Sequence, residues 1–184
     1  DVSDATAAKT LVEQVQGTWN RIDALINCAG PYHRVPLLEE TVEGWDAMFQ
    51  NNLHPGFYLS REIVVGMKER RWGRIINFSM ANADQMIAQT HVTAHYIAKV
   101  GVLILTRSLA KTLGPYGITV NAISPGFIDS GSTPTEELTT MVKQIPAGYI
   151  GDVNDTVSVV KFLLSDDARY VNGTNIHVSG AWGI

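Results

Sequence analysis

Three residues near the start of one apolar segment have side chains suited to proton transfer: His95, Tyr96 and Lys99. They lie in the stretch TAHYIAKVGVLILTRSLA, residues 93–110, where the spacing of apolar residues predicts a helix. An imidazole or a phenol can give a proton to a reacting oxygen, and a nearby ammonium group alters the pKa of either. The stretch therefore predicts an acid–base centre without deciding which residue is the acid.

The composition describes an ordinary globular protein. The chain has 184 residues, 45% hydrophobic and 17% charged, with a net charge of −4, so it offers no basic face for nucleic acid or an anionic membrane. No apolar run approaches the roughly 18 residues of a membrane span. The single cysteine, Cys28, cannot form an internal disulfide and lies in the apolar run ALINCAG. We expect a buried thiol, a cytoplasmic location and no signal peptide.

Helical and strand patterns alternate along the chain. Helices are predicted after the N-cap residues Ser3 and Asp4, at 42–68 with an interruption at 51–57, and at 95–114, 136–145 and 153–165. Strands are predicted within 22–30, 73–79, 117–126 and 174–180. This order predicts a single α/β domain, residues 1–184, with a parallel sheet covered by helices on both faces.

The ends of three predicted strands are small, polar and rich in glycine. They read NCAG at 27–30, FSMANA at 78–83 and SPGFIDSGS at 124–132. Ligands of open parallel sheets bind at the carboxyl ends of the strands. A binding site is therefore expected where these three segments meet the start of the helix that carries Lys99.

Five stretches, in order, resemble motifs of the short-chain dehydrogenase/reductase family. They are LINCAG, WDAMFQNNLHPGF, GRIINFS, the run 98–128 and YVNGTNIHVSGAWG. Within the family, the sequence most resembles the 3-oxoacyl-(acyl-carrier-protein) reductases and the pteridine reductase-like members. The resemblance implies a Rossmann-type doubly wound sheet and an oxidoreductase that transfers hydride between NADP or NAD and a carbonyl or hydroxyl substrate. A ketone reductase is expected, forming a homotetramer or homodimer, with no metal and no nucleic-acid or membrane partner.

The resemblance places catalytic roles on Asn52 and Lys99, but two other positions depart from the family pattern. His95 stands where the family has its tyrosine, and Tyr96 is one residue late. Met80 stands at the serine position, and Ser79 is one residue early. One residue turns a helical side chain by about 100°, and adjacent strand residues point to opposite faces.

Three interpretations of these departures remain open. In the first, the segment 81–93 shifts the register at both ends, so that Ser79 and Tyr96 are used. In the second, His95 is the acid, although Lys99 beside it would lower the imidazole pKa and leave the ring mostly neutral. In the third, the chain is a catalytically degenerate binding or scaffold protein that keeps the fold.

The resemblance also implies a set of dinucleotide contacts. The adenosine half would meet Asp1, Val2, Asn27, Ala29 and Gly30, and the nicotinamide half Lys99, Pro125, Gly126, Ile128 and Ser130. The glycine-rich turn with which the family cradles the pyrophosphate does not occur in this sequence. By resemblance about 60 residues would precede Asp1, so that the first strands of the sheet are expected to be missing.

Overall fold

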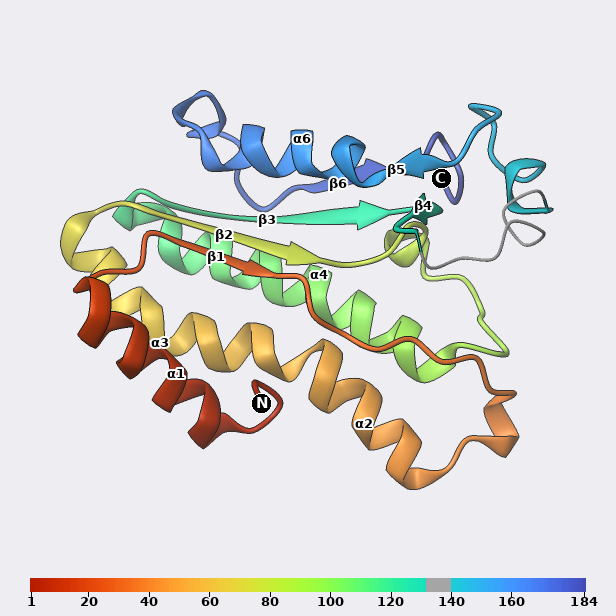
Figure 1. Cartoon of the computed structure of the whole chain (residues 1–184), viewed down its shortest axis with the longest axis horizontal. Coiled ribbons are helices and arrows are strands. Elements are labelled where there is room, and N and C mark those ends of the chain that lie inside the picture. The colour runs from red at the N-terminus through yellow and green to blue at the C-terminus, as the bar shows by residue number, and fades with distance from the viewer. Residues whose placement is uncertain (132–139) are drawn as a thin grey trace.

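The computed structural model describes residues 1–131 and 140–184, which form a four-stranded parallel sheet between layers of helices (Figure 1). In order across the sheet, the strands are β1 (Ala24–Asn27), β2 (Gly73–Phe78), β3 (Ile118–Pro125) and β6 (Asn175–Val178). A separate parallel pair joins β4 (Ile128–Asp129) to β5 (Gly151–Asp152). The predicted α/β class with a parallel sheet is confirmed.

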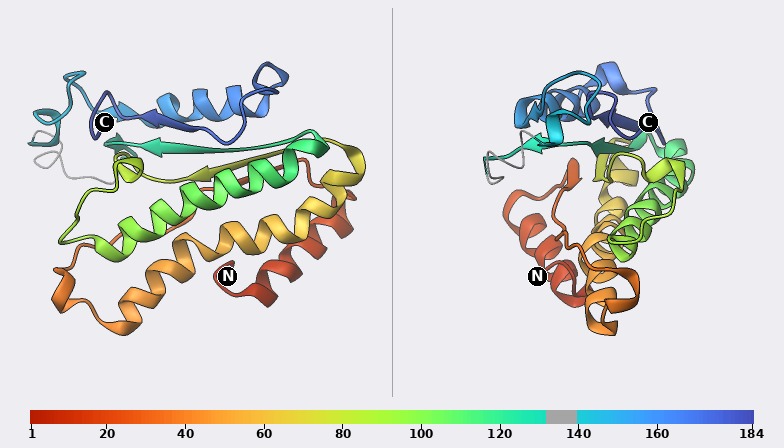
Figure 2. Two further views of the ribbon diagram at one scale, coloured as in Figure 1. Left: turned by 180° about the vertical axis from the view of Figure 1, so that it is seen from behind. Right: turned by 90° about the vertical axis from the view of Figure 1, so that its right-hand side faces the viewer.

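Helices cover both faces of the sheet. They are α1 (Ala5–Trp19), α2 (Val42–Asn52), α3 (His54–Arg70), α4 (Thr93–Leu113) and α6 (Val153–Leu164). Figure 2 shows α1, α3 and α4 on one side of the sheet and α6 on the other, which is the doubly wound arrangement. None of the helices described is both long enough and apolar enough to cross a membrane. The helix predicted at 136–145 falls largely outside the described residues.

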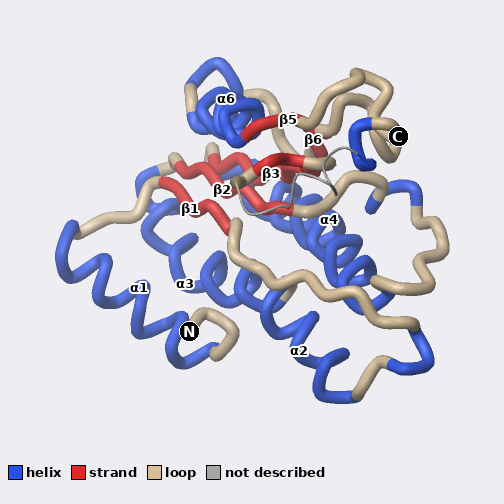
Figure 3. Tube along the Cα trace, turned by 45° about the vertical axis from the view of Figure 1, so that its right-hand side comes forward, coloured by secondary structure: helices blue, strands red, loops and turns tan. Residues whose placement is uncertain are grey.

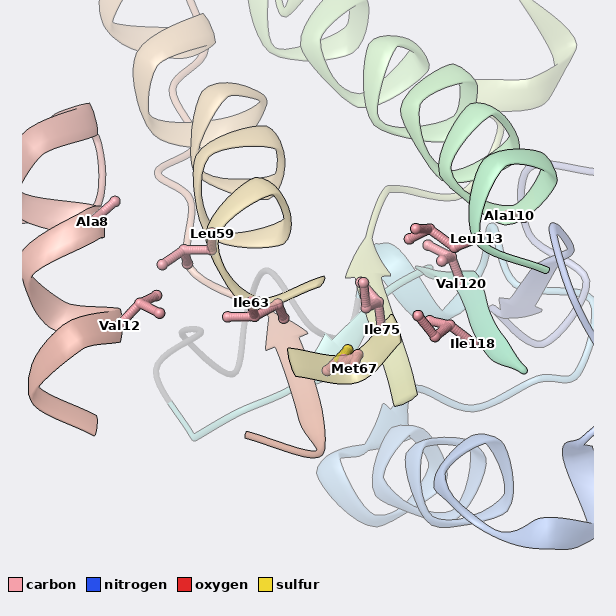
Figure 4. Packing of buried hydrophobic residues seen from close by; sticks show 10 residues of the cluster. All are labelled: Ala8, Val12, Leu59, Ile63, Met67, Ile75, Ala110, Leu113, Ile118 and Val120. Carbon is pink, nitrogen blue, oxygen red and sulfur yellow. The ribbon is translucent and has the colours of Figure 1, made fainter. Parts of the chain in front are cut away.

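Two apolar cores lie on opposite sides of the sheet. Figure 4 shows the larger one, where side chains from α1 and α3, such as Val12 and Ile63, pack toward Ile75 of β2. Ile76, the next residue of β2, belongs to the second core and packs with Leu163 of α6. Adjacent strand residues thus serve different cores, as the alternation of side chains along a strand requires.

The sheet ends at β1, as the sequence predicts (Figure 3). Within residues 1–131 and 140–184 no strand pairs with its outer side, and Ile26 is 43% exposed, whereas β2 and β3 are almost wholly buried. Cys28, directly after β1, is also exposed. The prediction of a buried thiol is therefore wrong, because an apolar run at a sheet edge is covered on fewer sides than one at its centre.

The predicted interruption of the second helix occurs between α2 and α3. Leu53 separates them, and Pro55 lies in the first turn of α3. A proline there has no N–H to give to the carbonyl of Asn51, so the ladder of helical hydrogen bonds is broken at this point. The break leaves Asn52 as the last residue of α2, facing the carboxyl ends of the strands.

Candidate active site

Gly30, Asn52 and Lys99 come together beyond the carboxyl ends of β1 and β2. The Lys99 ammonium donates a hydrogen bond of 3.0 Å to the carbonyl of Phe78, the last residue of β2. A Cβ added to Gly30 would lie 2.3 Å from Oδ1 of Asn52 and 3.6 Å from Nζ of Lys99. Only glycine leaves room for these two polar groups to converge.

Asn52 is held by its amide nitrogen and offers its amide oxygen. Nδ2 donates to the carbonyl of Met48 at 3.0 Å and to that of Pro31 at 3.1 Å. Oδ1 is buried and has no hydrogen-bond partner among the described residues. An unpaired buried acceptor is costly, so this oxygen is well suited to a donor supplied by water or a bound molecule.

Lys99 carries a charge in a buried position. Its residue is 7% exposed, and burial lowers the pKa of its ammonium to about 8, while the nearby Cys28 thiol opposes the shift. The group remains mostly protonated at neutral pH. With one of its three protons on Phe78, the ammonium can donate to two further acceptors, such as the hydroxyls of a ribose.

Ser79 directs its hydroxyl away from the open site. Its N–H continues the sheet by donating to the carbonyl of Ile123 at 2.8 Å, so the strand stays regular through this residue. Its Oγ donates to the carbonyl of Lys99 at 2.9 Å, in a buried position. The next residue, Met80, lines a cleft instead. The regular strand thus presents a thioether where the resemblance expects a hydroxyl.

Tyr96 uses its hydroxyl to hold a loop. The group donates to the carbonyl of Asn82 at 2.8 Å and accepts from the N–H of Ile87 at 3.1 Å, and the residue is only 5% exposed. The two bonds span the short helix η2 (Ala83–Gln85), which follows β2. The phenol of Tyr96 has therefore given its only proton to the protein itself.

His95 lies beside Lys99, at the position where the resemblance expects tyrosine. The residue is 7% exposed, and its Nδ1 is buried without a partner among the described residues. Burial, followed by the charges of Lys99 and His33, lowers the imidazole pKa to about 4. The neutral ring expected from the sequence is thus present, although burial is a larger cause than Lys99.

A cleft of about 820 Å³ opens next to this group. Its walls combine apolar side chains such as Met80, Phe127 and Trp182 with polar ones such as Arg34. Tyr32 also lines it, and the Tyr32 ring meets the His95 ring edge to face, at 5.1 Å between centroids and 88° between planes. Sequence reasoning missed Tyr32, although its place two residues after NCAG at a strand end was a usable signal.

The residues predicted for the adenosine half mostly share a second, smaller cavity. Val2, Asn27 and Ala29 line a space of about 170 Å³ together with Asn52. Asn27 is fixed from below, because its amide donates to Asn77 at 2.7 Å and Asn77 donates in turn to Thr106 at 2.9 Å. Asp1 is exposed and accepts from the N–H of Ser3 at 2.9 Å.

Apart from Lys99, the residues predicted for the nicotinamide half lie at the end of β3 or just beyond it. The carbonyl of Pro125 accepts from Ala81 at 3.0 Å, beside the cleft. Gly126 packs so closely on Ser179 that an added Cβ would lie 2.8 Å from that side chain. Ile128 begins β4, and Ser130 is exposed just beyond it. The unpaired Oδ1 of Asn52 and the two remaining ammonium protons of Lys99 fit the polar groups of a nicotinamide riboside. Gly30, predicted for the adenosine half, lies between these two groups instead.

Comparisons with known proteins cover nearly the whole chain. The family model described as Enoyl-(Acyl carrier protein) reductase matches residues 1–182. The 3-oxoacyl-[acyl-carrier-protein] reductase FabG of Haemophilus influenzae is 37% identical over 98% of this chain and 75% of its own length. The enzyme of the same name from Pseudomonas aeruginosa is 35% identical over 98% and 73%.

A solved structure gives the same result for the fold. The crystal structure of a putative gluconate dehydrogenase from Agrobacterium tumefaciens superposes with a TM-score of 0.90 at 29% identity. The match covers 98% of this chain and 72% of that one. Since the similarity covers 98% of the chain, the changes at Met80 and His95 are local changes within the part of the fold that the chain shares with these proteins.

Proposed function

The chain belongs to the short-chain dehydrogenase/reductase family of NAD(P)-dependent oxidoreductases, and from this we propose that it is a ketone reductase. The observation that carries the proposal is the convergence of Asn52 and Lys99 over Gly30, at the strand ends. The dinucleotide, when bound, supplies the hydride that reduces the carbonyl carbon. The protein has to bind it, hold the ketone beside it and provide a proton to the oxygen.

Lys99 would hold the ribose next to the nicotinamide. One ammonium proton goes to the carbonyl of Phe78, and the other two would donate to the ribose hydroxyls. The unpaired Oδ1 of Asn52 would accept from a water molecule that links the site to solvent. The remaining dinucleotide contacts are proposed for Asp1, Val2, Asn27, Ala29, Gly30, Pro125, Gly126, Ile128 and Ser130.

His95 and Met80 shape the carbonyl end of the site in this proposal. The geometry favours them over Tyr96 and Ser79, whose hydroxyls are both bonded inside the protein. The apolar part of the cleft wall, with Met80, Phe127 and Trp182, suits an acyl chain, in line with the names of the FabG relatives. A 3-oxoacyl thioester is therefore the first substrate to test, followed by small ketones.

The test is a steady-state assay of the purified protein with NADPH and with NADH against that panel. We expect oxidation of one of the two dinucleotides with a 3-oxoacyl thioester or another ketone. Calorimetric titration with each dinucleotide, run in parallel, measures binding independently of turnover. Tight dinucleotide binding with no turnover on any substrate would overturn the proposal.

That last outcome would support the alternative, a catalytically degenerate binding or scaffold protein. Its supporting observations are the internal hydrogen bonds of Ser79 and Tyr96 and the low pKa of His95. None of these three groups can donate a proton to a ketone readily at neutral pH. The alternative also requires that no other proton donor reaches the cleft. Tyr32, an exposed phenol that lines the cleft, does not meet this requirement.

We also propose that the protein is a homodimer or homotetramer built on α3, α4 and the last strand. Phe57 and Val65 of α3 are 48% and 61% exposed, and Ile97 and Ile104 of α4 are 43% and 55% exposed. Exposed apolar side chains on adjacent helices are typical of a subunit interface. Analytical ultracentrifugation would test this, and a purely monomeric protein at micromolar concentration would contradict it.

A further inference from the structure

The loop that follows β1 is fastened on both sides of Tyr32. The carbonyl of Pro31, the preceding residue, accepts from Nδ2 of Asn52 at 3.1 Å. Farther along, the N–H of Val35 donates to the carbonyl of His91 at 2.7 Å, and Leu37 donates to Thr90 at 2.9 Å. These bonds fix the backbone that carries Tyr32 to α2 on one side and to the wall of the cleft on the other.

The Tyr32 side chain is both positioned and accessible. Its ring lies edge to face on the His95 ring, a favourable geometry for two aromatic rings. The residue is 61% exposed and lines the cleft, and within the described chain its hydroxyl has no hydrogen-bond partner. Tyr32 therefore differs from Tyr96, which is buried with its hydroxyl fully engaged.

Among the described residues, none of His95, Ser79 and Tyr96 supplies a proton readily at neutral pH, and Lys99 has the role of holding the ribose in the proposed function. With a pKa of about 4, the His95 ring is mostly neutral at pH 7. The protons of Ser79 and Tyr96 are given to backbone carbonyls. A reductase built on this site requires a donor that can reach the substrate oxygen and be refilled from solvent.

We propose that Tyr32 is the proton donor of the reduction, and that His95 is a positioning residue that holds the Tyr32 ring against the site. The inference rests on the proposed ketone reductase function. As the carbonyl carbon gains hydride from the dinucleotide, the C=O π bond becomes an oxygen lone pair. The phenol O–H bond then breaks, an alcohol O–H bond forms, and the phenolate takes a proton from water. The ketone is reduced and the dinucleotide is oxidised.

In this arrangement the phenol comes from a different element, the loop after β1, and lines the cleft beside His95. The family pattern has tyrosine at position 95, on the helix, whereas here a flat neutral ring fills that position. The ring supports a tyrosine that comes from the loop after β1. A neutral imidazole suits this role, because it adds no charge to the one already on Lys99.

The experiment compares Tyr32→Phe with Tyr170→Phe. Phenylalanine keeps the ring contact with His95 and removes only the hydroxyl. Tyr170 is 99% exposed and lies with Trp72 and Arg74 near the opposite ends of the strands, so its change is the matched control. We expect kcat for ketone reduction to fall at least about 100-fold in Tyr32→Phe, as for loss of a general acid, and to stay unchanged in Tyr170→Phe. Dinucleotide affinity, measured by calorimetry, should stay within about twofold in both.

A second pair of variants tests the positioning role of His95. His95→Phe keeps an aromatic ring under Tyr32, whereas His95→Ala removes it. We expect His95→Phe to retain kcat within about threefold and His95→Ala to lose most of it, with little change in dinucleotide affinity. Rescue by phenylalanine would distinguish ring packing from proton transfer by the imidazole.

The outcomes separate the two proposals. Wild-type turnover that survives in Tyr32→Phe overturns the assignment of Tyr32 and leaves the reductase standing. Equal loss in both His95 variants, with Tyr32→Phe active, moves the donor to His95. Wild-type protein without turnover on the whole panel overturns both proposals together.

Discussion

The two halves of the site differ in how closely they keep the family pattern. On the side proposed to bind the dinucleotide, Val2, Asn27 and Ala29 line one cavity with Asn52, and hydrogen bonds from Asn27 to Asn77 and from Asn77 to Thr106 hold the Asn27 side chain. On the proton-transfer side, both expected hydroxyls are displaced by one residue and bonded inside the protein. The difference follows the packing, because Asn27 and Asn77 are hydrogen-bonded to neighbouring side chains, whereas Met80 lines the open cleft.

Loss of the ammonium that joins the two halves should have the largest effect. In Lys99→Met, we expect kcat to fall about 100- to 1000-fold and dinucleotide affinity about 10-fold, because a buried charge at the reacting oxygen is lost. Assays with saturating dinucleotide and calorimetry check the two quantities. Lys111→Met, at an exposed position on the same helix, is the control. A variant with normal turnover would remove Lys99 from the site.

The second-largest effect should come from adding a side chain at Gly30, between Asn52 and Lys99. In Gly30→Ala the new Cβ would lie 2.3 Å from Oδ1 of Asn52, whose amide is held by two hydrogen bonds. We expect the free energy of unfolding to fall by about 1–3 kcal/mol and kcat to fall about 10-fold or more. Gly17→Ala on α1, with no atom within 4 Å of its new Cβ, should instead add about 0.5–1 kcal/mol. Chemical denaturation measures the free energy of unfolding of both variants, and assays measure kcat. Equal changes in the free energy of unfolding of Gly30→Ala and Gly17→Ala would contradict the prediction.

On the proton-transfer side, the low pKa of His95 should make the free energy of unfolding depend on pH. The pKa of His95 is about 4 in the folded protein and about 6.5 in the unfolded chain. Between these values the unfolded state binds more protons, so the stability due to the neutral ring is present above pH 6.5 and lost as the pH falls to 4. The loss is on the order of 2–3 kcal/mol. Chemical denaturation of wild type and His95→Gln between pH 4 and pH 6.5 measures this loss. If the free energy of unfolding of the two proteins changes in parallel with pH, the prediction is wrong.

The smallest effect should come from Tyr96→Phe. The change leaves the carbonyl of Asn82 and the N–H of Ile87 without their partner, so we expect a loss of about 1–2 kcal/mol in the free energy of unfolding. The kcat should stay within about threefold of wild type, far from the effect expected of Tyr32→Phe. A loss of turnover as large as that in Tyr32→Phe would restore the interpretation in which Tyr96 acts as the acid.

The fold was predictable because its signals are local and repeated. Asp4 accepts from Ala7 as the N-cap pattern implies, and the helix break at Leu53 follows from Pro55. Exposure was less predictable: Trp19 shares a helical stripe with the buried Val12, yet is 68% exposed. Periodicity finds one face of a helix, but the neighbour that covers that face is set by tertiary packing.

The site was predictable in place but not in the direction of its side chains. Regular geometry at Ser79 could be foreseen from the strand pattern, and it holds. The use of the Tyr96 hydroxyl could not, since its partners Asn82 and Ile87 belong to a loop without a periodic signal. The sequence places Tyr32 at a strand end, but its contact with His95 joins residues 63 positions apart, which only the folded sheet brings together.

The parallel sheet also affects the rate of folding. Its ladders join Ala24 to Arg74, Gly73 to Ile118 and Ala122 to Asn175, each pair about 50 residues apart in the chain. No strand of this sheet can pair with a neighbour through a short hairpin, so each ladder needs the closure of a long loop before it gains stability. Refolding should therefore be slow compared with a helical bundle of similar size. During that delay the apolar strands β2 and β3 are open to pairing with other chains, and the yield of refolding should depend on protein concentration.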